Sequence, residues 1–63
     1  MNQFIQVTKI EYNDEEREFE ESTLYVNVDA IAYVNSKVIH LTSGETILCK
    51  EQFNDIVRLI NHP

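Results

Sequence analysis

The sequence predicts an α+β fold: an antiparallel meander of four or five strands followed by one C-terminal amphipathic helix packed on the sheet. Three observations support this prediction. Residues 51–61 repeat apolar side chains at the spacing of one helical face. Residues 37–50 hold two stretches rich in Val, Ile, Leu and Thr that flank the turn sequence Thr-Ser-Gly. Shorter apolar stretches upstream are separated by turn residues, as in strands joined by hairpins.

Length and composition are those of one small globular domain spanning residues 1–63. The chain has 63 residues, of which 43% are hydrophobic, with one Gly and one Pro. A chain of this size buries only about 60% of the surface that it exposes when unfolded. We therefore expect a small core, with no linker and no second domain.

The net charge of the chain limits the kinds of partner that it can bind. A net charge of -6 disfavours direct binding of nucleic acid or an anionic membrane, because both depend on Lys and Arg. A basic protein surface is a more favourable partner. Cys49 is the single cysteine, so no internal disulfide is possible and a reducing compartment fits best. The chain has neither a signal-peptide pattern nor a long apolar run, and we expect a cytoplasmic protein of a bacterium or its phage.

The first two strands are expected at residues 4–12 and 24–28. In the first, Phe4 and Ile10 fall on one parity and Ile5 and Val7 on the other, and this break in alternation predicts a bulge. The second ends in a tight turn, where Asp29 is expected to hydrogen-bond the local backbone.

An acidic segment, residues 12–22, lies between these two strands and holds six acids against one Arg17. We expect a hairpin tip or a mobile loop in which Asn13 and Asp14 turn the chain and Phe19 anchors its return. Keeping a small apolar domain soluble is one role for this charge, and docking a basic surface is the other. The candidate partner-binding residues are Asp14, Glu15, Glu16, Glu18, Glu20 and Glu21.

The next strands are expected at residues 30–34 and 37–41, joined by a turn at Asn35-Ser36. One helix covers one face of the sheet, and the opposite face keeps exposed apolar side chains, which soluble monomers rarely leave in large patches. Either the first strand curls over this face or a second copy of the protein covers it. We favour a homo-oligomer whose interface residues are Ile31, Tyr33, Val38 and Leu48.

The strands at residues 37–41 and 45–50 form a hairpin. A three-residue loop with Gly44 in the left-handed conformation places Ile39, Leu41, Ile47 and Cys49 on one face. A two-residue Ser43-Gly44 loop would separate Ile47 from Leu41, so we favour the longer loop.

The helix is expected over residues 51–61. Its acidic residues lie toward the start and Arg58 toward the end, in agreement with the helix dipole, and Pro63 prevents continuation. No Ser, Thr, Asp or Asn stands at the expected N-cap. The face expected to pack on the sheet consists of Phe53, Ile56, Val57 and Ile60.

No residues predict a catalytic, metal or cofactor site. His40, His62 and Cys49 lack the paired spacing of zinc ligands. The hairpin register places His40 and Cys49 on opposite faces, which argues against a nucleophile and its base. The acidic segment lacks the Gly and the ligand spacing of a calcium loop. We therefore expect no cofactor and no enzymatic activity.

Residues 25–60, YVNVDAIAYVNSKVIHLTSGETILCKEQFNDIVRLI, resemble the small bacterial flagellar and swarming-motility proteins of the FlbD type. The shared pattern is an Asn, an Ile-x-x-Ile/Val strand, Ile-x-Leu-x-x-Gly, a second strand and a Glu-initiated helix. The acidic segment departs from the compact Asn-Gly turn of that family. The resemblance implies the same fold and a non-enzymatic role, with no catalytic residues. The matching positions are Asn27, Ile31, Val34, Ile39, Leu41, Gly44, Ile47, Glu51 and Ile56.

These observations favour a small non-catalytic protein-binding or regulatory module that forms a homo-oligomer. A second hypothesis is an acidic inhibitor, phage-encoded in origin, that occupies the basic nucleic-acid-binding surface of a target protein. A third is an oligomer that binds a small ligand at a subunit interface.

Overall fold

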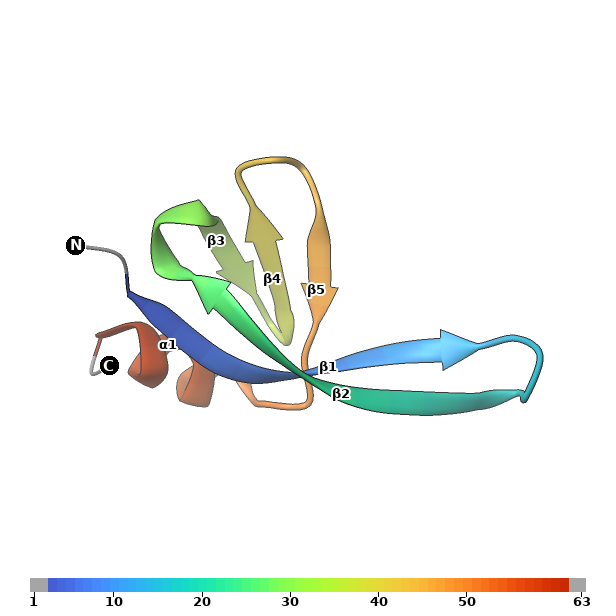
Figure 1. Ribbon diagram of the computed structural model, residues 1–63. Helices are drawn as coiled ribbons and strands as arrows, with labels where there is room; N and C mark the ends of the chain where they lie inside the picture. Colours follow the sequence, from blue (N-terminus) through green and yellow to red (C-terminus); the bar gives the residue numbers. More distant parts are fainter. Residues whose placement is uncertain (1–2, 62–63) are drawn as a thin grey trace.

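A computed structural model describes residues 3–61, so His62 and the expected helix stop at Pro63 lie outside the described residues. Residues 3–61 form five antiparallel strands in two sheets and one helix near the C-terminus, which confirms the expected α+β class (Figure 1). The elements are β1 (Phe4–Asn13), β2 (Glu18–Asn27), a short 3-10 helix η1 (Val28–Ala30), β3 (Ile31–Asn35), β4 (Val38–Leu41), β5 (Thr46–Leu48) and α1 (Phe53–Asn61).

The first sheet is a long two-stranded hairpin. β1 and β2 pair from Phe4 opposite Asn27 to Asn13 opposite Glu18 without a register shift, so the bulge expected in the first strand is absent. β2 also begins at Glu18, well before the expected start at residue 24. Glu has a low intrinsic propensity for strands. Pairing with β1 outweighs this preference here, because strand propensity depends strongly on context.

The second sheet has the order β3-β4-β5. The turn between β3 and β4 is Ser36-Lys37, one residue later than expected, with Ser36 at a φ of 57°. A bulge in β3 lies between Ile31 and Tyr33 and places Ile31 opposite Leu41. Directly paired residues share a face of the sheet, so Ile31 faces the core together with Leu41. The expectation that Ile31 lies on the outer face with Tyr33 is therefore wrong.

The hairpin of β4 and β5 has the expected three-residue loop. The Leu41 N–H donates to the Glu45 carbonyl at 2.9 Å, and Gly44 has a φ of 95°, where a side chain would be strained. Val38 pairs with Leu48 and Ile39 with Ile47. Ile39, Ile47 and Cys49 are buried on one face, as the register argument predicts.

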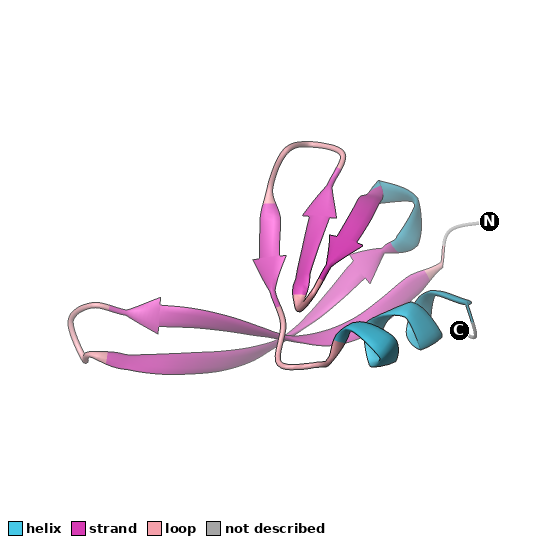
Figure 2. Ribbon diagram, turned by 180° about the vertical axis from the view of Figure 1, so that it is seen from behind, coloured by secondary structure: helices cyan, strands magenta, loops and turns pink. Residues whose placement is uncertain are grey.

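The two sheets join where the chain leaves β5. Cys49 pairs with Lys9 of β1, and the Lys50 N–H donates to the Thr8 carbonyl at 2.9 Å. In Figure 2, α1 follows this junction and lies beside the body, at the end of the molecule away from the β1–β2 turn. The strands therefore follow one another in the order β2-β1-β5-β4-β3 around a single core. The buried residues are Ile5, Val7, Val26, Ile39, Ile47, Cys49 and Ile56.

The helix packs through Ile56 and Ile60 of the expected face and through Leu59, whereas Val57 is half-buried and is not part of the core cluster. Ile56 is fully buried, and Leu59 and Ile60 pack partly buried against the core. Phe53 begins the helix and remains 44% exposed. The expected packing of Phe53 in the core is wrong, because the buried part of the helix begins one turn later.

Truncation of Ile56 should destabilise the protein more than truncation of Phe53. We expect Ile56→Ala to lower the free energy of unfolding by about 2–5 kcal/mol, the usual cost of a core cavity. Phe53→Ala should cost about 1–2 kcal/mol, because much of its side chain never leaves water. Chemical denaturation of both variants measures this, and equal losses would contradict the packing described for α1.

Candidate functional site

The β1–β2 hairpin projects beyond the body of the molecule. We call its outer part, residues 10–21, the arm. The molecule measures 40 × 22 × 19 Å, and Figure 1 shows that the arm accounts for the elongation. No residue of the arm is buried. The arm therefore presents both of its faces to the surroundings.

The tip of the arm is a turn held by one asparagine. The Asn13 side-chain oxygen accepts hydrogen bonds from the backbone N–H groups of Glu15 and Glu16, at 3.0 and 3.2 Å. Arg17 completes the turn with a φ of 56°. Asp14, Glu15 and Glu16 are thus the acidic residues at the outermost point of the arm.

The pairing of β1 with β2 gives the arm two different faces. Directly opposite residues share a face. One set joins the Tyr12–Phe19 pair to the Ile10–Glu21 pair, and we call this side the aromatic face. The other set joins the Glu11–Glu20 pair to the Asn13–Glu18 pair, and we call this side the acidic face.

The two rings of the aromatic face contact each other and are exposed. The rings of Tyr12 and Phe19 make an edge-on contact with centroids 5.1 Å apart and an angle of 65° between planes. These residues are still 52% and 67% exposed. Exposed aromatic residues that are already held by a neighbour suit protein contacts, since little conformational entropy is lost on binding.

The acidic residues predicted to bind a partner do not form one patch. Glu18 and Glu20 lie on the acidic face, where the Asn13 side-chain amide donates to Glu20 at 2.9 Å. Glu11, which the sequence prediction did not include, lies opposite Glu20 and pairs with Lys9 at 2.6 Å. Glu21 lies on the aromatic face. The tip, the acidic face and the aromatic face thus divide the six predicted carboxylates among them.

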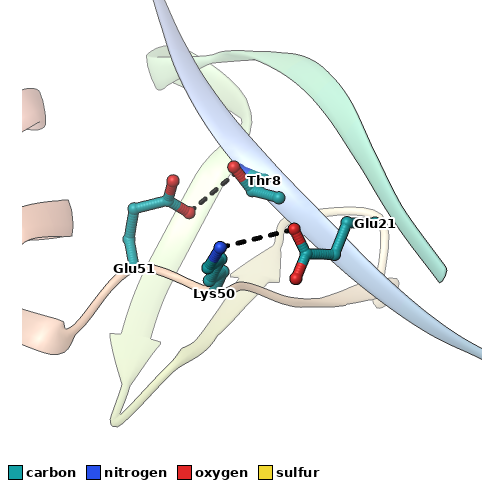
Figure 3. A network of polar contacts seen from close by, with 4 residues as sticks. All are labelled: Thr8, Glu21, Lys50 and Glu51. Atoms are coloured by element: carbon teal, nitrogen blue, oxygen red, sulfur yellow. Dashed lines mark hydrogen bonds and ion pairs between the residues drawn. The ribbon is translucent and has the colours of Figure 1, made fainter. Parts of the chain in front are cut away.

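The arm is anchored at its root by the chain that follows β5 (Figure 3). The Thr8 backbone N–H donates to Oε1 of Glu51 at 2.9 Å, and Lys50 Nζ lies 3.5 Å from Oε1 of Glu21. Partial burial alone raises the pKa of Glu51, but the hydrogen bonds from Thr8 and the charge of Lys50 outweigh it and lower that pKa. The ionised Glu51 carboxylate therefore stabilises the junction of the two sheets.

A hollow of about 370 Å³ lies between the aromatic face and the second sheet. Ile10 and Phe19 of the arm meet Leu48 there, and Leu48 is 43% exposed. Val38 lies directly opposite Leu48 in the sheet. The full lining is Ile10, Phe19, Glu21, Lys37, Leu48 and Cys49.

Three of the four predicted interface residues share the outer face of the second sheet. Val38 and Leu48 form a cross-strand pair, and Tyr33 stacks on His40 with ring centroids 4.1 Å apart. Ile31 packs against the core instead, because the bulge in β3 turns its side chain to the face of Leu41. The sequence reasoning missed Ile10 and Tyr12, although the placement of Tyr12 and Phe19 on either side of the Asn13 turn indicates a cross-strand pair.

A second groove, of about 300 Å³, opens between β2 and the hairpin of β4 and β5. Its walls are partly exposed edges of the core, and its rim is polar. Among residues 3–61, every buried side-chain N or O atom has a hydrogen-bond partner, so the groove contains no unpaired buried polar group aimed at a ligand. The lining residues are Lys9, Leu24, Tyr25, Val26, Asn27, Ala30, Leu41, Glu45, Thr46 and Ile47.

Cys49 and His40 occupy different environments in the body. Cys49 is fully buried, and burial, together with the nearby Glu51 carboxylate, raises the pKa of its thiol. His40 lies on the opposite face of the sheet, paired with Thr46. In the part of the chain that the structure describes, no group of His, Cys, Asp and Glu is arranged to hold a metal ion. Within residues 3–61, no helix has the length and apolar character needed to cross a membrane.

Comparison of the chain with protein-family models, with curated proteins and with solved structures returns no match. The arm, the hollow at its root and the outer face of the second sheet are therefore interpreted from their own chemistry.

The Glu51 carboxylate should make stability depend on pH in a defined direction. Its pKa is lowered in the folded protein, so its stabilisation is complete above the unfolded pKa of about 4.3 and is lost as the pH falls through the folded pKa. We expect Glu51→Gln to lower the free energy of unfolding at pH 7 by about 1 kcal/mol, a charged hydrogen bond weakened by partial exposure. Chemical denaturation at several pH values measures this.

Glu15→Gln is the control, because Glu15 lies exposed at the arm tip. Its stability should follow that of the wild type at every pH. A Glu51→Gln deficit that persists unchanged from pH 7 to pH 2 would contradict the role assigned to the ionised carboxylate.

Proposed function

We propose that this protein is a small non-catalytic protein-binding module that self-associates through the hollow and the adjoining outer sheet face. The observation that carries the proposal is the convergence of Ile10 and Phe19 from the arm with Leu48 from the second sheet. These residues are far apart in the sequence, and they line one concavity beside half-buried Val38 and exposed Tyr33. The non-enzymatic role implied by the resemblance of residues 25–60 to FlbD-type proteins agrees with it.

The physical argument concerns apolar area and charge. Phe19, Leu48 and Tyr33 are each between 43% and 67% exposed, which is costly in water. A second copy that covers them recovers this cost, and small domains commonly gain stability by association. Lys37, at the rim of the hollow, makes no salt bridge among the described residues and is a natural partner for a carboxylate of the second copy.

A second candidate function is an acidic inhibitor that occupies the basic, nucleic-acid-binding surface of a target protein. It is favoured by the carboxylates at the tip and on the acidic face, which project away from the body on the arm. An inhibitor of this kind needs no self-association. Its affinity for the target falls steeply as the salt concentration rises, since exposed charges are screened over about 8–10 Å.

Charge placed on the outer sheet face should dissociate the assembly. We expect the wild type to self-associate at micromolar concentrations in sedimentation equilibrium. Leu48→Glu and Val38→Glu should each raise the dissociation constant about tenfold or more, because each replaces an apolar contact of the interface with a carboxylate that must lose its water.

Phe53→Glu is the matched control, since Phe53 is as exposed as Leu48 but lies on α1. It should associate as the wild type does. Circular dichroism establishes that each variant is folded. A wild type that stays monomeric at high micromolar concentration would overturn the proposed self-association and leave the inhibitor as the remaining candidate.

A further inference from the structure

β2 has a free edge along the arm. β2 pairs with β1 over its whole length, and within residues 3–61 no other backbone hydrogen bond reaches it. Figures 1 and 2 both show open space beside β2 along the arm. An exposed edge strand offers a row of N–H and C=O groups to which another extended chain can pair.

The register identifies which backbone groups point outward. The Thr8 N–H and C=O of β1 bond to Glu51 and Lys50, so they point away from β2. Thr8 and Thr23 are therefore a pair without mutual hydrogen bonds, and Thr23 likewise directs its N–H and C=O away from β1. By the alternation of the ladder, Glu21 and Phe19 do the same.

The charge of β2 indicates what can pair there. β2 contains Glu18, Glu20 and Glu21 and no Lys or Arg. A second copy paired along this edge would bring two rows of carboxylates together, which is unfavourable. An added strand instead meets Glu18 and Glu20 on the acidic face. On the aromatic face it meets Phe19 and Glu21, and the Glu21 carboxylate already lies beside Lys50. The complementary strand carries basic residues on one side and apolar residues on the other.

We propose that the arm binds its partner by strand addition at the β2 edge, and that the partner segment is an extended peptide in which basic and apolar residues alternate. The inference rests on the proposed role as a protein-binding module and names the partner of that module. Backbone pairing to Phe19, Glu21 and Thr23 supplies the register. Glu18 and Glu20 select basic side chains, and the exposed ring of Phe19 selects apolar ones.

The test uses a fluorescent octapeptide of alternating lysine and valine, and fluorescence anisotropy with the wild-type chain. Its matched control carries N-methyl groups on alternate amides, which keeps every side chain and charge but removes donors on one edge. We expect the unmodified peptide to bind, and the peptide methylated on the pairing edge to bind at least about tenfold more weakly, as the loss of a few backbone hydrogen bonds requires. Two methylated peptides are made, one modified at the odd-numbered amides and the other at the even-numbered amides. One of the two therefore lacks the donors on the edge that pairs with β2.

Two variants of the protein complete the test. Thr23→Pro removes an N–H that points to the free edge, a position where edge strands tolerate proline, and should weaken binding about tenfold. Glu18→Gln combined with Glu20→Gln should weaken binding by a similar factor at low salt and flatten its salt dependence. Thr23→Val is the control for the side chain at this position and should bind as the wild type does.

Equal affinity for the unmodified peptide and both methylated peptides would overturn strand addition. Such a result would mean that the peptide binds through its charges and not through its backbone. No binding of any peptide would overturn strand addition as well, and the carboxylates would then serve only to keep the edge from pairing. Sedimentation equilibrium separates this failure from that of the proposed function, because assembly through Leu48 and Val38 does not use the β2 edge. Dissociation of the assembly by Thr23→Pro would assign the edge to a second copy and also overturn the inference.

Discussion

The structure depends on one short seam, where Cys49, Lys50 and Glu51 run alongside β1. Two backbone contacts and one side-chain hydrogen bond, from Thr8 to Glu51, join the sheets there. Without this seam, a two-stranded hairpin would be marginally stable at best in water. With it, Ile5 and Val7 of β1 are buried against the second sheet. The seam also directs the chain into α1, whose Ile56 completes the core.

The seam also explains why β1 and β2 differ at their outer edges near the root of the arm. Pairing with Lys50 and Glu51 occupies the outer edge of β1 near Thr8 and leaves the outer edge of β2 open. Beyond this point no residue of the hairpin is buried, and its alternation of side chains produces an aromatic face and an acidic face. Glu21 and Lys50 form an exposed ion pair at the root of the arm. Folding thus accounts for the root of the arm, while its outer residues remain available for contacts.

The elements that could be predicted from the sequence are those whose signals are local. Gly44 sets the loop of the β4–β5 hairpin, and from that loop alone Ile39, Ile47 and Cys49 follow as core residues. Ile56 likewise follows from helical spacing. Three features depended on distant partners instead. β2 extends to Glu18 because β1 lies beside it, Ile31 turns inward through a bulge that no local signal marks, and Phe53 remains exposed because the core ends before the first turn of α1.

The candidate surface was only partly predictable for the same reason. The acidic residues were evident from composition, but their division between the tip and two faces requires the register of β1 against β2. Phe19 was evident as an isolated apolar residue, whereas its contact with Tyr12 depends on the turn at Asn13. Leu48 and Val38 were predictable as cross-strand neighbours on the outer face. Their meeting with Ile10 and Phe19 in one hollow required the seam, which joins segments distant in sequence.

Amide hydrogen exchange, followed by NMR, tests the seam and the free edge in one measurement. The Thr8 and Lys50 amides should exchange slowly, because each donates a hydrogen bond at the junction of the sheets. Along β2, the amides of Glu20 and Ser22, which face β1, should exchange more slowly than those of Glu21 and Thr23, which face outward. Rapid exchange at Thr8 and Lys50, or equal rates at these four β2 amides, would contradict the arrangement on which the rest of the structure depends.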